Sequence, residues 1–177
     1  MNRIINYIII VIFIILSNLS AQKVTPRQYF FTVKKIFPDT EEIGVFIQSS
    51  ELPEVKDKIA LAAAQAQIKV KIYSVSDFKS IGKGLKKLPQ SGTIVVYPSP
   101  ILLDKSSKLF VLKKCKEKAV AVISESKEYS DAGALLGIFP QVGAKTKIIL
   151  NLKHSQDLLA KFTPDYVKQV GISEVIH

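Results

Sequence analysis

Small polar side chains and one aromatic recur where the apolar runs of this sequence end. The uncharged run 43–47 is followed by Gln48, Ser49 and Ser50, and three later runs end in similar groups. The full set of candidates is Gln48, Ser49, Ser50, Ser74, Ser76, Tyr97, Ser99, Ser124 and Ser126. If the runs are parallel strands, these residues share the sheet edge where such folds bind small polar or anionic ligands. The same serines also suit helix caps and turns, so both interpretations stay open.

The residue patterns of known catalytic and metal sites are not found in the sequence. The loop 48–50 has no glycine to cradle a phosphate, and Ser99 lies between two prolines rather than in a Gly-x-Ser-x-Gly turn. His154 and His177 have no partner at metal-ligand spacing, and no paired carboxylates stand out. We therefore expect a non-catalytic protein without a metal or cofactor. A secreted enzyme with a spatially assembled site is the less favoured alternative.

The first 21 residues have the pattern of an export signal. Arg3 gives a basic head, residues 7–16 are an unbroken apolar run, and residues 17–21 are mostly small or polar. The apolar run is shorter than the ~20 residues of a bilayer-spanning helix. We expect cleavage after Ala21 and a periplasmic or otherwise exported protein. An uncleaved N-terminal anchor is the alternative.

The chain is basic, with 25 Lys and Arg against 15 Asp and Glu, a formal net charge of +10. An exported protein does not normally meet nucleic acid, so this charge indicates solubility, an anionic lipid surface or an acidic partner. The lysines are scattered along the sequence, which favours a solvated surface. Cys115 is the single cysteine, so no internal disulfide is possible, and we expect it to be a half-buried, inert thiol in a helix.

Strand-like and helix-like segments alternate through most of the chain, which predicts a parallel sheet with right-handed crossovers. A helix beginning at Thr25-Pro26 comes first and is expected to lie across the sheet or at its edge. The predicted strands are 43–47, 68–74, 93–97 and 119–123, and the predicted helices are 52–67, one capped by Ser76-Asp77, and 102–118. Strand 68–74 alternates apolar and polar residues as an edge strand does, whereas 93–97 is apolar and central.

The pattern changes after residue 133. Runs 134–139 and 145–152 are joined by only five residues, too few for a crossover helix, so an antiparallel hairpin is predicted. Short helices over 155–162 and 165–170 follow. The prediction is one α/β domain, residues 22–177, with four parallel strands and a C-terminal antiparallel hairpin in a three-layer sandwich.

Several short segments resemble one lobe of the ABC-transporter substrate-binding family. They are residues 36–39 leading into 43–46, the loop 48–53, Val96-Tyr97-Pro98, and 133–137. The resemblance covers most of residues 36–152 and implies a flavodoxin-like, periplasmic-binding-lobe fold that binds a ligand. A complete transport receptor has two lobes, and this chain has length for one.

The C-terminal part is also similar to the YfiR-type periplasmic repressors. The similarity lies in residues 133–139 and 148–153. Members of that family are single secreted domains that repress membrane-bound diguanylate cyclases, and they often carry disulfides, which this chain cannot form internally.

Together these features predict an exported ligand-binding or regulatory protein. It would sense a small polar ligand, act on a membrane partner (a sensor kinase, a diguanylate cyclase or a transporter component), or do both. The alternative is a homodimer that mimics two lobes and binds a small molecule for an ABC-type uptake system. No nucleic-acid partner is expected.

Overall fold

The computed structural model describes residues 23–141, 146–153 and 160–177. The predicted export signal, His154 and residues 155–159 of the predicted helix 155–162 lie outside the described residues. Residues 160 and 161, at the end of that predicted helix, form a turn.

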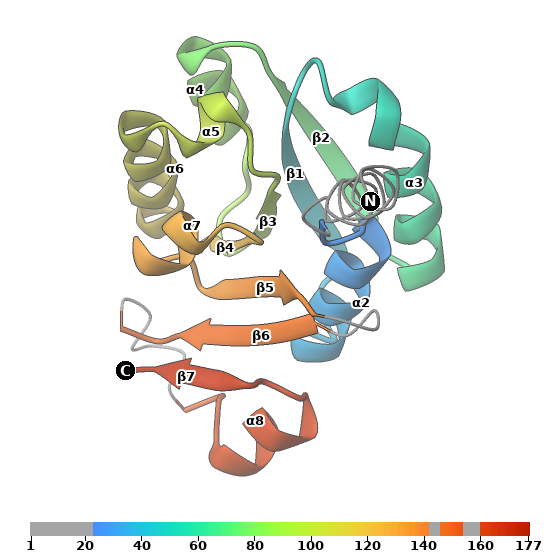
Figure 1. The fold of residues 1–177 in the computed structure, drawn as a ribbon, viewed down its shortest axis with the longest axis vertical. Helices are drawn as coiled ribbons and strands as arrows, with labels where there is room; N and C mark the ends of the chain where they lie inside the picture. The colour runs from blue at the N-terminus through green and yellow to red at the C-terminus, as the bar shows by residue number, and fades with distance from the viewer. Residues whose placement is uncertain (1–22, 142–145, 154–159) are drawn as a thin grey trace, which may run out of the picture.

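The fold is built on one seven-stranded sheet with the order β2-β1-β3-β4-β5-β6-β7 (Figure 1). Neighbouring strands from β2 to β5 run parallel, β6 is antiparallel to β5, and β7 is parallel to β6. The strands are β1 (Glu42–Gln48), β2 (Lys69–Val75), β3 (Thr93–Val96), β4 (Ala121–Ser124), β5 (Leu136–Pro140), β6 (Thr146–Asn151) and β7 (Glu174–Ile176). The predicted edge position of β2 and interior position of β3 are confirmed.

Helices cover both faces of this sheet, as the three-layer prediction requires. On one face, Phe30 of α2 and Ile59 of α3 share a core with Val45 of β1. On the other face, Ile81 of α4 and Val111 of α6 belong to a second core. The helices are α2 (Pro26–Ile36), α3 (Leu52–Ala66), α4 (Phe78–Lys86), α5 (Pro100–Leu103), α6 (Lys105–Glu117), α7 (Lys127–Asp131) and α8 (Pro164–Gln169).

The predicted count of four parallel strands is wrong. The first hairpin strand, β5, itself pairs in parallel with β4 through Ile123 and Leu136, so five strands are parallel. Helix α7 makes the crossover between them and is only five residues long, too short for its periodicity to be visible in the sequence. The hairpin itself is confirmed, with β5 and β6 in register from Leu136–Leu150 to Pro140–Thr146. Strand β7 was not predicted and is three residues long.

The predicted helix 102–118 is two helices. The chain breaks at Asp104, whose backbone leaves the helical region (φ −50°, ψ 136°). Its carboxylate accepts a hydrogen bond from the Ser107 N–H at 3.0 Å and so caps α6. Ser99 caps α5 in the same way, at 3.4 Å from the Leu102 N–H.

The chain changes direction between β1 and β3. From β1 it passes through α3 to β2, and from β2 it returns through α4, on the opposite face, to β3. The loops that leave the carboxyl ends of β1 and β3 therefore diverge. Open α/β sheets bind ligands at such a point.

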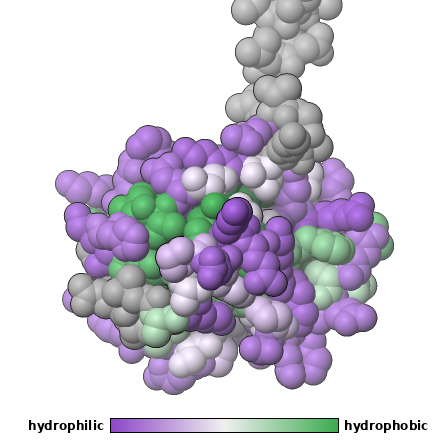
Figure 2. All heavy atoms as spheres, turned by 90° about the horizontal axis from the view of Figure 1, so that it is seen from below, coloured by the Kyte–Doolittle hydropathy of each residue, from purple (hydrophilic) through white to green (hydrophobic). Residues whose placement is uncertain are grey.

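Most of the surface seen from the β7 end of the molecule is hydrophilic (Figure 2). Apolar residues interrupt it in a strongly apolar region on the left of that view and in a smaller, paler one on the right. Of the helices in the described part of the chain, none is long and apolar enough to span a bilayer.

Candidate functional site

A cavity of about 780 Å³ opens at the carboxyl edge of the sheet, on the face covered by α2 and α3. Its floor is formed by residues at the ends of β1, β3 and β4, and its walls by the start of α2 and by one side of α3 along the length of that helix. The lining residues are Lys23, Val24, Thr25, Pro26, Arg27, Ile47, Glu51, Glu54, Val55, Lys58, Leu61, Ala62, Gln65, Tyr97 and Glu125. Because α2 begins here, the position of its N-terminus determines the shape of the cavity.

Helix α2 begins at this place because its N-terminus is strongly capped. Thr25 accepts a hydrogen bond from the Gln28 N–H at 3.2 Å, and the Gln28 amide oxygen accepts from the Thr25 N–H at 2.8 Å. Pro26 occupies the first helical turn, where its missing N–H costs nothing. Tyr29 and Phe30 of α2 are fully buried and fix the helix on the sheet.

Two neighbouring tyrosine hydroxyls, one of them on a residue that lines the cavity, have no hydrogen-bond partner. Tyr97, immediately after β3, lines the cavity and is 8% exposed, while Tyr29 of α2 is fully buried. Their rings are 5.3 Å apart at an angle of 50°, and neither hydroxyl makes a hydrogen bond. The Glu125 backbone N–H lies near the Tyr29 hydroxyl without reaching hydrogen-bond geometry. Burial raises the pKa of both phenols, so both are neutral hydrogen-bond donors.

Glu125 is the acidic group nearest these tyrosines. Burial raises the pKa of its carboxyl above the ordinary 4.5, and the charge of Glu51 adds to this rise. A hydrogen bond from the Val24 N–H to Oε2 and the charge of Lys23 act in the opposite direction. Glu125 follows β4 and Val24 precedes α2, so this hydrogen bond joins the two sides of the cavity. A carboxyl that is partly removed from water attracts a cationic or hydrogen-bond-donating group.

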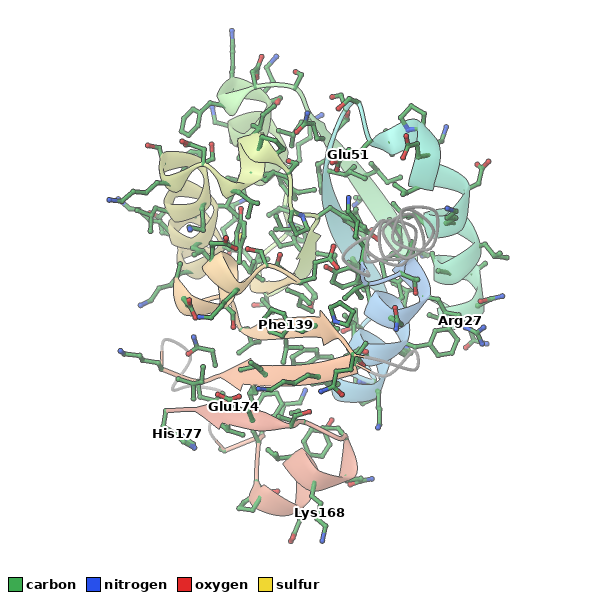
Figure 3. The ribbon with its side chains drawn as sticks, viewed as in Figure 1. Arg27, Glu51, Phe139, Lys168, Glu174 and His177 are labelled. Carbon is green, nitrogen blue, oxygen red and sulfur yellow. The ribbon has the colours of Figure 1, made fainter. Side chains whose placement is uncertain are left out.

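The rim of the cavity holds charges of both signs. Glu51 and Glu54, at the start of α3, add two carboxylates, and Lys23, Arg27 and Lys58 add three cations. Figure 3 shows Glu51 at the start of α3 and Arg27 on α2. The Arg27 guanidinium is 5.3 Å from the Phe31 ring centroid, a cation–π contact that holds it beside α2. Apolar side chains form the walls between these charges, so the cavity suits an amphipathic molecule.

Four of the nine sequence-predicted residues form two pairs at the ends of β1 and β2. The hydroxyls of Ser49 and Ser74 are 2.7 Å apart, and the Gln48 amide donates to the Ser50 hydroxyl at 3.1 Å. The side-chain amide oxygen of Gln48 (Oε1) is buried and has no partner. Ser76 is exposed, and its backbone N–H donates to the Ser80 hydroxyl at 3.0 Å. None of these residues lines the cavity.

The serines that follow β3 and β4 make local structural contacts. Ser99 is a buried helix cap, and Ser126 caps α7 by accepting from the Tyr129 N–H at 3.3 Å. Ser124 is fully buried; its hydroxyl donates to the Val96 carbonyl at 2.9 Å and accepts from the Ser126 N–H at 3.2 Å. Tyr97 is thus the predicted residue that the structure brings into the cavity.

Glu125 and the residues at the start of α2 line the cavity but were not predicted from the sequence. Glu125 stands directly after an apolar strand, between Ser124 and Ser126, so its position at the sheet edge was visible. The contribution of residues 23–27 was not visible, because it depends on where α2 lies against α3.

The thiol of Cys115 and the arrangement of possible metal ligands bear on two further kinds of site. Cys115 is buried in α6, and burial raises the pKa of its thiol to about 12, so it stays protonated. Residues 23–141, 146–153 and 160–177 contain no cluster of three or more His, Cys, Asp or Glu side chains that would hold a metal ion.

No protein-family model matches the chain, and no curated protein is similar to it. Solved structures are similar. A conserved domain protein from Vibrio cholerae O1 biovar El Tor has a TM-score of 0.70 at 11% identity, over 87% of this chain and 61% of that one. An ABC domain in complex with L-Trp from Streptococcus pneumoniae has a TM-score of 0.66 at 18% identity, over 88% and 64%.

A ligand-free, open substrate-binding protein with adhesive properties from Clostridium difficile has a TM-score of 0.62 at 18% identity, over 86% of this chain and 60% of that one. This chain therefore spans less than two thirds of the length of each of these structures. At such low identity the similarity shows the fold alone. That fold is an α/β lobe like those of substrate-binding proteins, as the sequence predicts.

Proposed function

We propose that this protein binds a small amphipathic ligand in the cavity between α2, α3 and the carboxyl edge of the sheet, and performs no catalysis. The observation behind this proposal is the unpartnered hydroxyl of Tyr97 beside the desolvated carboxyl of Glu125 in a 780 Å³ cavity. Ligand pockets have volumes of about 300–1,000 Å³ and combine apolar walls with a few polar groups. The fold supports the proposal, since two of the similar structures are described as a substrate-binding protein and as a complex with L-Trp.

The chemistry of the lining defines the class of ligand. Glu125 and Glu51 suit an amino group, the Tyr97 hydroxyl suits a hydrogen-bond acceptor, and Ile47 and Leu61 suit an apolar body. Lys23 and other rim cations suit a carboxylate. An amino acid with an apolar side chain meets all of these requirements, whereas a small apolar amine meets those for the amino group and the apolar body alone.

Thermal denaturation in the presence of a panel of amino acids, amines, purines and inorganic anions tests the proposal. A ligand at 100 times its Kd stabilises the folded protein by about 2.7 kcal/mol, which raises Tm by roughly 5–11 °C at this chain length. Tyr97→Phe and Glu125→Gln are each expected to weaken the response at least about tenfold in ligand concentration. Tyr73→Phe, at a tyrosine outside the cavity, is the matched control. No shift with any member of the panel, or equal shifts in all variants, contradicts the proposal.

The serine pairs at the neighbouring strand ends are proposed as a second contact region for the same ligand. Ser49 and Ser74 lie at the same sheet edge as Tyr97, one loop away from the cavity. Ser49→Ala is expected to reduce affinity less than Tyr97→Phe does. If the double variant Ser49→Ala/Ser74→Ala binds the ligand with unchanged affinity, the two serines serve the loop structure alone.

We also propose that the protein is exported and reports ligand binding to a membrane protein, as a regulator of the YfiR-type or a transporter component would. The composition of residues 1–21 supports export. Crosslinking in cells, followed by mass spectrometry, is expected to recover a sensor kinase, diguanylate cyclase or transporter subunit. Recovery of self-crosslinked dimers alone favours the homodimeric uptake protein instead.

A further inference from the structure

The lysines that are scattered in the sequence are gathered by the fold on one face. Helices α4 and α6 lie side by side on the sheet face opposite α3 (Figure 1). We call residues 77–87 and 104–118 the α4–α6 face. It contains ten lysines and three acidic residues, a net charge of +7 out of +10 for the whole chain.

Most of these lysines are free to meet an external partner. Lys79 and Lys83 of α4 and Lys113 and Lys116 of α6 are exposed. None of the four forms an ion pair with a described residue. The three acidic residues are already engaged: Asp77 and Asp104 cap the two helices, and Glu117 pairs with Lys114 at 2.6 Å. The acidic side chains of this face therefore compensate little of its positive charge.

Large apolar side chains stand among these lysines. Phe78 is 50% exposed and Leu109 is 48% exposed, two of the four exposed large hydrophobic residues of the described chain. Phe78 packs against Phe110 of the neighbouring helix, with ring centroids 5.1 Å apart. On α6, Leu109 lies one turn from both Lys105 and Lys113, so an apolar side chain and cations share one helical stripe. The α4–α6 face therefore combines apolar side chains with uncompensated cations.

We propose that the α4–α6 face docks on an anionic lipid bilayer, with Phe78 and Leu109 entering the interface and the surrounding lysines at the level of the headgroups. Surface helices bind bilayers through the combination of buried apolar area and attraction of cations to anionic lipids. Lysine suits this place because its stem lies along apolar surface while its ammonium reaches the headgroups. The ligand cavity lies across the sheet, beside α2 and α3, so docking leaves it open.

Flotation of the full chain with vesicles of phosphatidylcholine, with and without 30 mol% phosphatidylglycerol, tests the proposal. The readout is the partition coefficient for the anionic vesicles divided by that for the neutral vesicles. The apolar run 7–16 contributes equally to both coefficients, so its contribution cancels in the ratio. The combined change of Lys79, Lys83, Lys113 and Lys116 to Gln is expected to lower this ratio at least about 100-fold, since each lysine near such a surface contributes about a fivefold preference. The matched control changes four exposed lysines elsewhere, Lys56, Lys69, Lys153 and Lys168, to Gln.

Leu109→Gln separates insertion from simple charge attraction. It is expected to weaken binding to the anionic vesicles several-fold without changing the thermal stability, because Leu109 is exposed. Equal losses in the α4–α6 variant and the control variant overturn the proposal, as does equal binding of the unmodified chain to both vesicles. Retention on immobilised polyglutamate without enrichment on anionic vesicles also overturns it and assigns the face to an acidic protein.

Discussion

Removing one oxygen atom from Tyr97 is expected to stabilise the protein. Its hydroxyl is buried without a hydrogen-bond partner, whereas in the unfolded chain it is bonded to water. Mutational data give a cost of about 1–3 kcal/mol for a buried, unsatisfied hydroxyl. Tyr97→Phe keeps the ring and its contact with Tyr29, so it removes this cost and leaves no cavity. We expect the free energy of unfolding to rise by about 1 kcal/mol and Tm by roughly 2–4 °C.

The same chemical change at Tyr129 has the opposite expected sign. The Tyr129 hydroxyl donates to the Leu102 carbonyl at 2.9 Å in a fully buried position. Tyr129→Phe therefore leaves a buried carbonyl without its partner, a loss of about 1–2 kcal/mol. Tyr29→Phe is expected to behave like Tyr97→Phe, because its hydroxyl also has no partner.

Urea unfolding followed by circular dichroism, with linear extrapolation, measures all three variants. We expect the free energy of unfolding to rise for Tyr29→Phe and Tyr97→Phe and to fall for Tyr129→Phe. Because the rings of Tyr29 and Tyr97 touch, the double variant is expected to deviate from additivity. Destabilisation by Tyr97→Phe equal to that of Tyr129→Phe refutes the claim that the cavity tyrosine is unpartnered.

Three further outcomes are expected. In α4, Gly82→Ala is expected to stabilise the folded protein by about 0.5–1 kcal/mol, because the new methyl group has room, 3.8 Å from the nearest side chain. Gly84→Ala is expected to destabilise it by about 1–3 kcal/mol, because its methyl group would lie 2.9 Å from the ring of Phe46. Urea midpoints check this pair, and the same sign for both contradicts it. The raised pKa of Glu125 means that the folded state binds its proton more tightly than the unfolded state, so its contribution to stability falls as pH rises from about 4.5 through the folded pKa. The difference between wild type and Glu125→Gln, followed by thermal denaturation across pH 4–8, is expected to show this loss; a difference that is independent of pH argues against it. Finally, Cys115 is expected to react with a thiol reagent only after denaturation, because its thiol is buried with a pKa of about 12; rapid labelling of the native protein contradicts this.

The sheet was predictable from the sequence where strands are buried and helices are long. Run 43–47 has no charged residue, and it forms a strand with neighbours on both sides. The two-residue periodicity of 68–74 correctly indicated an edge. Periodicity fails for elements of one turn or three residues, which explains the missed α7 and β7. The break at Asp104 was missed because the apolar pattern continues on both sides of it, although an Asp three residues before Ser107 is a capping pattern.

The candidate site was predictable only in part. The rule that ligands bind at the carboxyl edge of a parallel sheet placed Tyr97 correctly, because that rule depends on topology alone. The cavity itself forms between α2 and the sheet edge, and no local pattern in residues 23–27 reveals which strand end they will cover. The basic face was hidden for a similar reason, because α4 and α6 are separated by a strand in the sequence and become neighbours only in the folded protein.

The hydrogen bond between the Val24 N–H and the Glu125 carboxylate connects residues that are 101 positions apart. It fastens the first described residues of the chain to the end of β4. A ligand amino group that competes for this carboxylate, or a proton that neutralises it, therefore weakens the attachment of the start of α2 to the end of β4.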